Sequence, residues 1–413
     1  MTTLMDRTPS REAAARLPAV PQKFSRLQRR LADTDVLPFE VQMEDGTVHR
    51  FAGGRTPPGG GAQFRVVVRN PSGRRAFASL DELQLGEAYL DGDIDIEGEF
   101  LCCLDLRPVL TDRHPLQLAA RHLVPLIIGQ RRADLAGTGK HYDLGTDFYF
   151  AFLDTEFHMY SQALYTSEHE SLEQAVRNKL EYITGVCRME SGMHVLDVGG
   201  GWGSFERFAG PRGVSSTMLT VSREQYAYLD HWSGTHGMPC QMKVIRESIF
   251  AYEAAERYDA IVLLGVMEHL PDYPRLFARF ARLLRPGGRV YMDFAAQKDE
   301  KPIGEFVARY VFKGNHRPVY LPGLFKGAVA NGFEPIALHN DRHSYYLTLQ
   351  AWARNLEAAR DRVVPLVGER AYRIFRLYLW GCARQLQRDG SLESYRVAFQ
   401  LASGRSSSEI GLR

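Results

Sequence analysis

After residue 190 the sequence alternates between short apolar segments and amphipathic ones, and this alternation constrains the fold more than any other feature. The segments HVLDV (194–198) and YDAIVLL (258–264) have the length and composition of buried strands. The segment FARFARLLRPGGRVYMDF (277–294) predicts an amphipathic helix, a Pro-Gly-Gly turn and a further strand. Strands that alternate with helices predict a doubly wound α/β sheet, mostly parallel, which binds its ligand at the carboxyl ends of the strands.

The chain before residue 141 differs in composition and predicts separate parts. Residues 1–20 have the composition of a disordered tail. Residues 21–115 alternate around turn signals such as Asp45-Gly46 and predict a small α+β domain for lipid binding or dimerisation. Residues 116–140 are basic and apolar and predict a helical linker. Residues 141–413 then make up the α/β domain, with helical insertions after the strand that ends near residue 294.

Composition and charge exclude several classes of protein. The net charge of +2 argues against a nucleic-acid-binding protein, and the five cysteines have no zinc-ligand spacing, so we expect reduced thiols and no metal site. No uncharged run reaches the roughly 18 residues that span a bilayer. A basic cluster at Lys23, Arg26, Arg29 and Arg30 fits either a solvated helix face or a segment that rests on anionic lipid. These patterns predict a soluble, cytoplasmic protein that contacts a membrane at its surface.

The segment VLDVGGGWG (195–203) carries the strongest local signal. Its glycines stand where a strand turns into a helix and where a ligand approaches the backbone. Asp197 precedes them by two residues and is suited to hold an ammonium group. No acidic residue ends the second strand, where an NAD site would place a carboxylate for the ribose. The segment therefore favours S-adenosylmethionine (SAM) over NAD.

Several segments of the chain together resemble the cyclopropane fatty acid synthase family of SAM-dependent methyltransferases. The resemblance is carried, in order, by HYDLGTDFYFAFLD (141–154), VLDVGGGWG (195–203), LTVSREQ (219–225), GVMEHL (265–270), LTLQAW (347–352) and YLWGCARQ (378–385). It implies a Rossmann-like class I methyltransferase with a helical lid. It also implies C-methylation of the cis double bond of an acyl chain in a membrane phospholipid, giving a cyclopropane, or a methyl-branched or methylene product.

The resemblance and the glycine-rich turn assign eleven residues to SAM. They are Tyr160, Ser161, Asp197, Gly199, Gly201, Trp202, Thr220, Ser222, Gln225, Glu247 and Ser248. The resemblance also implies that His141, Tyr142 and Asp143 organise the lid. Cys382 is expected to be a buried apolar residue.

The residues that would remove a proton depart from the family, which holds a bicarbonate ion with a Cys, a Glu, a His and a Tyr. Glu268 and Tyr345 match that pattern, whereas Gln162 and Asp293 stand at the Cys and His positions. These four residues are the predicted catalytic group. Three interpretations stay open: Asp293 or Glu268 replaces bicarbonate as the base, bicarbonate binds through Gln162 and Tyr345, or a proton leaves a neighbouring carbon and no ring forms.

Two other classes of function stay open at this point. A methyltransferase for a small polar acceptor would share the glycine-rich turn, and a non-catalytic lipid-binding relic would share the fold. The expected partners are phospholipid acyl chains, a membrane surface and, as a homodimer, a second copy of the chain. The expected location is the cytoplasm, peripherally at the inner membrane.

Overall fold

The structure, a computed structural model, describes residues 24–56, 60–111, 144–297, 307–311, 316–388 and 392–403. It divides into two compact units, Met1–Asp112 and Arg113–Arg413. The predicted tail 1–20, the linker 116–140 and the lid residues His141, Tyr142 and Asp143 lie outside the described residues. What was expected of these segments stays a prediction.

The first unit is a small α+β structure around a four-stranded sheet of order β2-β1-β3-β4. The strands are β1 (Phe39–Gln42), β2 (Val48–Phe51), β3 (Phe64–Val68) and β4 (Ile94–Gly98). The helices are α1 (Ser25–Leu31), α2 (Pro71–Ser79), α3 (Glu82–Leu90), α4 (Phe100–Cys103) and the 3-10 helix η2 (Leu104–Val109). Helices and strands are thus both present, as in the small α+β structure that the sequence predicted for this region.

The apolar face of helix α1 packs into the core of the first unit. Leu27 and Leu31 are buried in a core that also contains the stacked rings of Phe39 and Phe64. Arg30 donates to the carbonyl of Val109 over 2.6 Å and so ties α1 to η2. Because this face packs into the core, α1 has no apolar face left to rest on lipid, and its exposed arginines form a solvated face.

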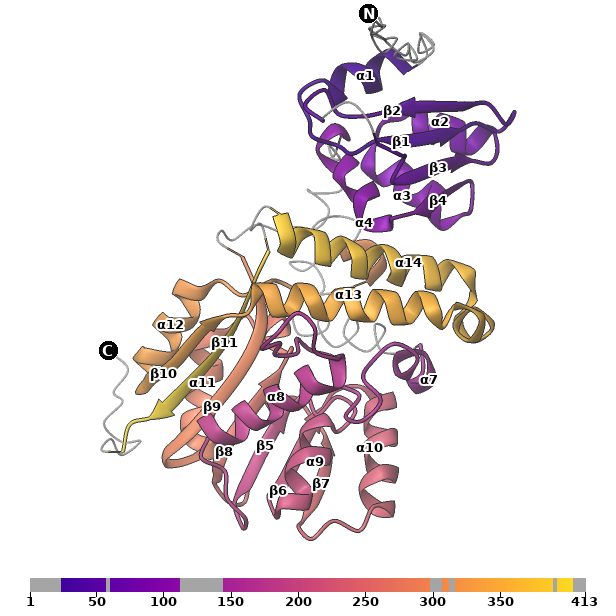
Figure 1. The fold of residues 1–413 in the computed structure, drawn as a ribbon. Helices are drawn as coiled ribbons and strands as arrows, with labels where there is room; N and C mark the ends of the chain where they lie inside the picture. Colours follow the sequence, from indigo (N-terminus) through magenta and orange to yellow (C-terminus); the bar gives the residue numbers. More distant parts are fainter. Residues whose placement is uncertain are drawn as a thin grey trace, which may run out of the picture. The chain divides into compact units, whose positions relative to one another are not determined.

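The second unit is built on a seven-stranded sheet of order β10-β11-β9-β8-β5-β6-β7 (Figure 1). Its strands are β5 (His194–Val198), β6 (Ser215–Thr220), β7 (Met242–Arg246), β8 (Tyr258–Leu264), β9 (Leu284–Ala296), β10 (Phe333–Asn340) and β11 (Glu393–Leu401). The pairs from β9 through β8, β5 and β6 to β7 are parallel, whereas β11 is antiparallel to both of its neighbours. The strand order reverses between β5 and β8, and a doubly wound sheet binds ligands at such a point. The predicted doubly wound α/β fold is confirmed.

Helices cover both faces of this sheet. They are α7 (Thr146–Phe150), α8 (Leu172–Val186), α9 (Ser204–Ala209), α10 (Arg223–Thr235), α11 (Tyr273–Leu283), α12 (Leu321–Ala330), α13 (Arg342–Ala358) and α14 (Arg360–Arg388), with short turns η3 (Gly210–Arg212), η4 (Met267–His269) and η5 (Val307–Val311). Helix α11 buries Leu276, Phe277 and Phe280 against the sheet, on the face opposite α8 and α9 (Figure 1). Its amphipathic spacing explains this placement.

Helices α13 and α14 are the helical insertions predicted after the strand ending near residue 294, and they run side by side as a pair (Figure 1). The helical segment α14 contains a kink at Gly368, whose φ of 83° lies in the left-handed region. Within the described ranges, no helix is both long and apolar enough to cross a membrane.

Candidate active site

The turn at residues 154–159 is held by a single buried carboxylate. Asp154 accepts backbone hydrogen bonds from Phe157 over 2.6 Å, from His158 over 3.2 Å and from Met159 over 2.7 Å. Three such bonds to one charged acceptor fix the backbone firmly. The segment that follows, 160–162, is therefore presented in a defined position.

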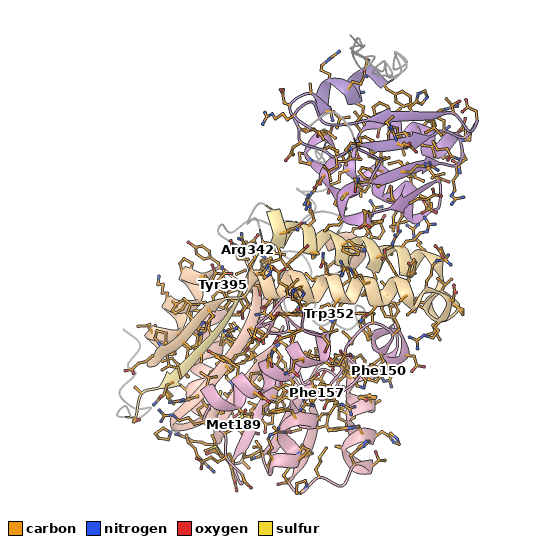
Figure 2. All side chains as sticks on the ribbon, in the orientation of Figure 1. Phe150, Phe157, Met189, Arg342, Trp352 and Tyr395 are labelled. Carbon is orange, nitrogen blue, oxygen red and sulfur yellow. The ribbon has the colours of Figure 1, made fainter. Side chains whose placement is uncertain are left out.

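An aromatic wall surrounds Tyr160. Its ring centre lies 5.3 Å from that of Trp352 and 5.2 Å from that of Tyr149. Trp352 comes from α13, and Figure 2 shows where its side chain leaves this helix. The backbone of Ala163 also donates to the Thr348 hydroxyl over 3.0 Å, so α13 is bonded to the segment that carries Tyr160.

Two glycines allow three parts of the chain to meet closely. Gly199, with φ of +96°, follows β5, and a Cβ there would lie 2.4 Å from a methyl of Val266. Gly265, with φ of +68°, follows β8, and a Cβ there would lie 2.9 Å from the Cβ of Ser161. Side chains at either position would be strained and would clash. The turn after β5 therefore approaches Val266, and the turn after β8 approaches the 160–161 segment, only because both residues are glycines.

A cavity of about 1080 Å³ lies at the carboxyl ends of β5, β6 and β8. All eleven residues predicted to contact SAM line it: Tyr160, Ser161, Asp197, Gly199, Gly201, Trp202, Thr220, Ser222, Gln225, Glu247 and Ser248. Three arginines, at 246, 275 and 317, also line it. The structure thus brings together residues that the sequence spreads over 89 positions, although their contact with SAM itself stays a prediction.

The polar groups of this cavity fit SAM. Thr220 donates to the Gln225 side chain over 2.9 Å, which places a hydroxyl and an amide at the end of β6, where a carboxylate for NAD is missing. The buried indole nitrogen of Trp202 has no hydrogen-bond partner among the described residues, so it is a donor beside the cavity with unused capacity. The volume is ample for a ligand of this size.

Asp197 shares its buried surroundings with a second carboxyl group. Burial first, and then the charge of Glu206, raise the pKa of Asp197 well above its ordinary range. Burial raises the pKa of Glu206 to about 7. Two close carboxyl groups disfavour a double negative charge, so a ligand ammonium beside Asp197 would favour its ionised form.

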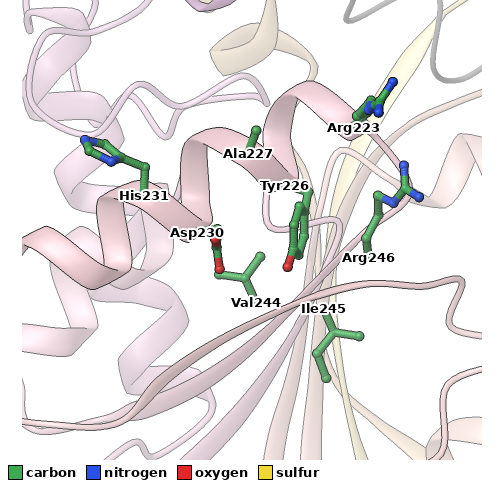
Figure 3. Close-up of a pocket in the computed structure, with 8 residues that line it drawn as sticks. All are labelled: Arg223, Tyr226, Ala227, Asp230, His231, Val244, Ile245 and Arg246. Carbon is green, nitrogen blue, oxygen red and sulfur yellow. The ribbon is translucent and has the colours of Figure 1, made fainter.

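A second, more open hollow adjoins the first and is shown in Figure 3. Residues of α10 and β7 line it, and Arg246 belongs to both hollows. Arg223 and Arg246 lie at the same end of this hollow (Figure 3). None of the predicted SAM or catalytic residues lines it, so the candidate site is the larger cavity.

Glu268 is a buried carboxyl group with one free oxygen. It is 5% exposed and lies in η4, next to cavity residues. Its Oε1 accepts from the backbone of Ala295 over 2.6 Å, whereas Oε2 has no hydrogen-bond partner among the described residues. Burial raises its pKa to about 7. A carboxyl group with a pKa near neutrality is suited to proton transfer.

Asp293 is fully buried and forms an ion pair that the sequence did not predict. Lys179 on α8 places its Nζ 2.8 Å from Asp293 Oδ2, and both side chains are at most 2% exposed. The same ammonium donates to the Ser161 hydroxyl over 2.6 Å. Burial raises the pKa of Asp293, and the Lys179 charge opposes this. The ion pair also relieves the repulsion expected between Asp293 and Glu268.

Gln162 is held by a network behind the cavity. Its Nε2 donates to Asp341 Oδ2 over 3.2 Å and approaches the carbonyl of Tyr395 at 3.4 Å, while its Oε1 accepts from the Ser394 hydroxyl. Asp341 in turn pairs with Arg396 over 2.6 Å. Both the nitrogen and the oxygen of the Gln162 amide are therefore hydrogen-bonded within the protein.

Tyr345 lies in the first turn of α13. Its backbone N–H donates to the backbone carbonyl of Asp341 over 2.8 Å, and its ring is edge-on to the Trp352 ring, with 6.4 Å between the ring centres. None of the four predicted catalytic residues lines the cavity as the described residues form it. Two of them, Asp293 and Glu268, lie close enough to influence each other's charge.

Lys179 is the principal residue that the sequence interpretation missed, although a signal exists. In α8 the buried positions include Leu172, Val176, Leu180 and Ile183, and Lys179 lies on this same apolar face. A charged residue on an apolar stripe requires a buried partner. That partner, Asp293, lies on a distant strand and cannot be identified from local spacing.

The buried residues do not fit a bicarbonate ion. Lys179 is already paired with Asp293, and the Gln162 amide donates to the chain itself. An added anion would share the region with the carboxylates of Asp293 and Asp341, at a high electrostatic cost in a buried setting. The second of the three interpretations is therefore disfavoured.

The chain is similar to known lipid-modifying enzymes. A family model described as mycolic acid cyclopropane synthetase matches residues 130–396, and a model of a domain of unknown function matches residues 27–105. The chain is 28% identical to a probable fatty acid methyltransferase of Pseudomonas putida, over 84% of this chain and 88% of the relative. It is 29% identical to the cyclopropane-fatty-acyl-phospholipid synthase of Escherichia coli, over 82% of this chain and 88% of the relative.

A solved structure extends this similarity to three dimensions. Mycolic acid cyclopropane synthase CmaA1, complexed with SAH and CTAB, matches with a TM-score of 0.59 and 26% identity. The match covers 64% of this chain and 98% of that one.

The fold and the cavity define a class I SAM-dependent methyltransferase, and SAM is its cofactor. The family model matches well over half of the chain, so the chain belongs to the mycolic acid cyclopropane synthetase family. The predicted membership among cyclopropane synthase relatives is confirmed.

Proposed function

We propose that this enzyme methylates the cis double bond of an unsaturated acyl chain within a membrane phospholipid. The observation that carries the proposal is the arrangement of one large cavity, lined by the predicted SAM residues, with aromatic rings and buried carboxyl groups next to it. The similarity to a cyclopropane-fatty-acyl-phospholipid synthase over most of both chains supports the choice of substrate.

The chemistry needs an apolar, closed site. When bound, SAM would supply an electrophilic methyl group and would leave as S-adenosylhomocysteine, whose sulfur keeps the electron pair of the broken S–C bond. A double bond is a weak nucleophile, so it must be held in line and close to that group. Tyr160 and Ser161 follow the turn held by Asp154 and line the cavity, and they would close over it and exclude water.

The acyl chain becomes positively charged once its double bond has formed the new C–C bond. Aromatic faces such as those of Tyr160 and Trp352 would stabilise this charge. The chain then loses a proton, and the electron pair of the broken C–H bond forms either the ring or a new double bond. The proton passes to a carboxylate, for which Glu268 and Asp293 are the candidates, and leaves a neutral carboxylic acid.

The product depends on which carbon loses the proton. Loss from the transferred methyl group closes a cyclopropane ring or, after a hydride shift within the chain, leaves a methylene group, whereas loss from a neighbouring chain carbon leaves a methylated alkene. The replacement of the family's Cys and His by Gln162 and Asp293 keeps both outcomes open.

The remaining predictions on location and assembly belong to the same proposal. The enzyme would work in the cytoplasm at the surface of the inner membrane, as a homodimer. The unit Met1–Asp112 would bind lipid or mediate dimerisation.

Expression in a host that makes monounsaturated phospholipids tests the proposal. We expect mass spectrometry of the acyl chains to show a gain of one CH₂, with loss of unsaturation only if a ring forms. The Gly199→Ala variant serves as the inactive control, because its added methyl clashes with Val266. Unchanged acyl chains would contradict the proposal. Methylation of a small polar acceptor would then favour a small-molecule methyltransferase, and failure to bind SAM would favour a non-catalytic relic.

A further inference from the structure

The Lys179–Asp293 pair is a buried ion pair beside the cavity. Lys179 Nζ lies 2.8 Å from Asp293 Oδ2 and 2.6 Å from Ser161 Oγ, and Ser161 itself lines the cavity. The pair is thus separated from the cavity by a single hydroxyl group. Burying two charges is costly, so an ion pair at this place requires an explanation beyond stability.

The charges around the pair balance without any external ion. Burial lowers the pKa of Lys179, and the charges of Asp293 and, at longer range, of Asp341 and Asp197 oppose this. Asp341 is neutralised by Arg396, 2.6 Å away. Glu268 stands near Asp293 as well, and its burial favours the neutral form by raising its pKa to about 7. Burial raises the pKa of Asp197 as well and so disfavours its charged form, which leaves Lys179 and Arg396 as the two cations that balance the carboxylates of Asp293 and Asp341.

The geometry points to a role for Lys179. We propose that Lys179 is a buried anion site that this chain fills with its own carboxylate, Asp293, so that the reaction proposed above proceeds without a bound external anion. Lys179 is then a positioning residue: it holds the Asp293 carboxylate and donates to the hydroxyl of Ser161, which lines the cavity. The role of this site in the reaction rests on the proposed function, but the binding of an anion to Lys179 can be tested without that function.

Removal of the carboxylate should make the site available to a small free anion. In Asp293→Ala the side chain no longer fills the space beside the Lys179 ammonium. We expect carbon-13-labelled formate to bind this variant, seen as broadening of its NMR signal and as a higher melting temperature. On lipid vesicles, activity should fall about 100-fold and recover about 10-fold with formate.

Two variants separate this site from general effects of the mutation. Asp293→Asn loses the same charge but still fills the space, so formate should not bind it. The double variant Asp293→Ala with Lys179→Met has the space but no cation, so formate should not bind it either. The proposal would be overturned if formate bound all three variants equally. It would also be overturned if formate did not bind Asp293→Ala.

The unmodified protein supplies a second measurement, which does not depend on the folding of any variant at position 293. Labelled bicarbonate should not bind to it at this site. Broadening of the bicarbonate signal that disappears in Lys179→Met would show an external anion on Lys179 while Asp293 is present, and would overturn the proposal. Neither NMR measurement requires lipid methylation, so failure of the anion site and failure of the proposed function are distinguishable.

Discussion

Replacement of Glu268 by Gln should make the enzyme more stable in alkaline solution. Burial raises the pKa of Glu268 to about 7 from an ordinary value of 4.5, so the folded chain holds the proton more tightly than the unfolded chain. The stability that this group contributes is complete below pH 4.5 and is lost as the pH rises through 7. A difference of about 2.5 pKa units corresponds to about 3 kcal/mol. The amide introduced by Glu268→Gln would not ionise and would keep an oxygen to accept from Ala295.

Urea unfolding at two pH values measures this effect. All four tryptophans lie in the second unit, at 202, 232, 352 and 380, so their fluorescence reports on the unit that contains Glu268. We expect Glu268→Gln to match the wild type within about 1 kcal/mol near pH 5 and to exceed it by about 3 kcal/mol above pH 8. Glu247→Gln removes a carboxyl group that is exposed and serves as the control. Parallel pH dependence of Glu268→Gln and wild type would refute the reasoning.

Three further substitutions test the cofactor cavity and its surroundings. Gly199→Ala should raise the dissociation constant of SAM, measured by calorimetry, by at least about 10-fold. The control Gly185→Ala adds a methyl group in open space on α8 and should leave that constant unchanged. Equal affinities of the two variants for SAM would contradict the predicted contact. Glu206→Gln removes a charge that raises the pKa of Asp197. Asp197 should then stay ionised to lower pH, so SAM binding should persist to lower pH than in the wild type. An unchanged pH profile of SAM binding would count against the role of Asp197. Gln162→Cys breaks the buried hydrogen bonds of its amide and should lower the unfolding free energy by about 1–3 kcal/mol, with a loss near zero as the contrary result.

The parallel part of the sheet could be predicted because its signals are local. Strands β5, β6 and β8 are short segments that each lead through a turn into a helix, and right-handed connections then fix the order. Strand β11 is different, since Glu393–Leu401 inserts between β9 and β10 and runs antiparallel to both. Its pairing with β9 joins residues about 100 positions apart, for which no local pattern exists.

The cofactor residues could be predicted for the same reason, whereas the inner charges could not. The SAM residues sit in short motifs at strand ends, and the carboxyl ends of parallel strands meet at one edge. The Lys179–Asp293 pair joins a helix to a strand 114 positions later. The amide of Gln162 similarly finds partners about 180 and 230 positions away. The sequence indicated that Gln162 and Asp293 were unusual, but only the packed structure identifies their partners.

One measurement tests the central claim most directly. The purified enzyme is incubated with vesicles of monounsaturated phospholipid and with SAM that carries a fully deuterated methyl group, and the acyl chains are analysed by mass spectrometry. The account predicts deuterium in the acyl chain at the former double bond, with one deuterium lost if the methyl group itself gives up the proton and none lost if a neighbouring carbon does. Acyl chains free of deuterium, with the label in a head group or in no lipid at all, would contradict it.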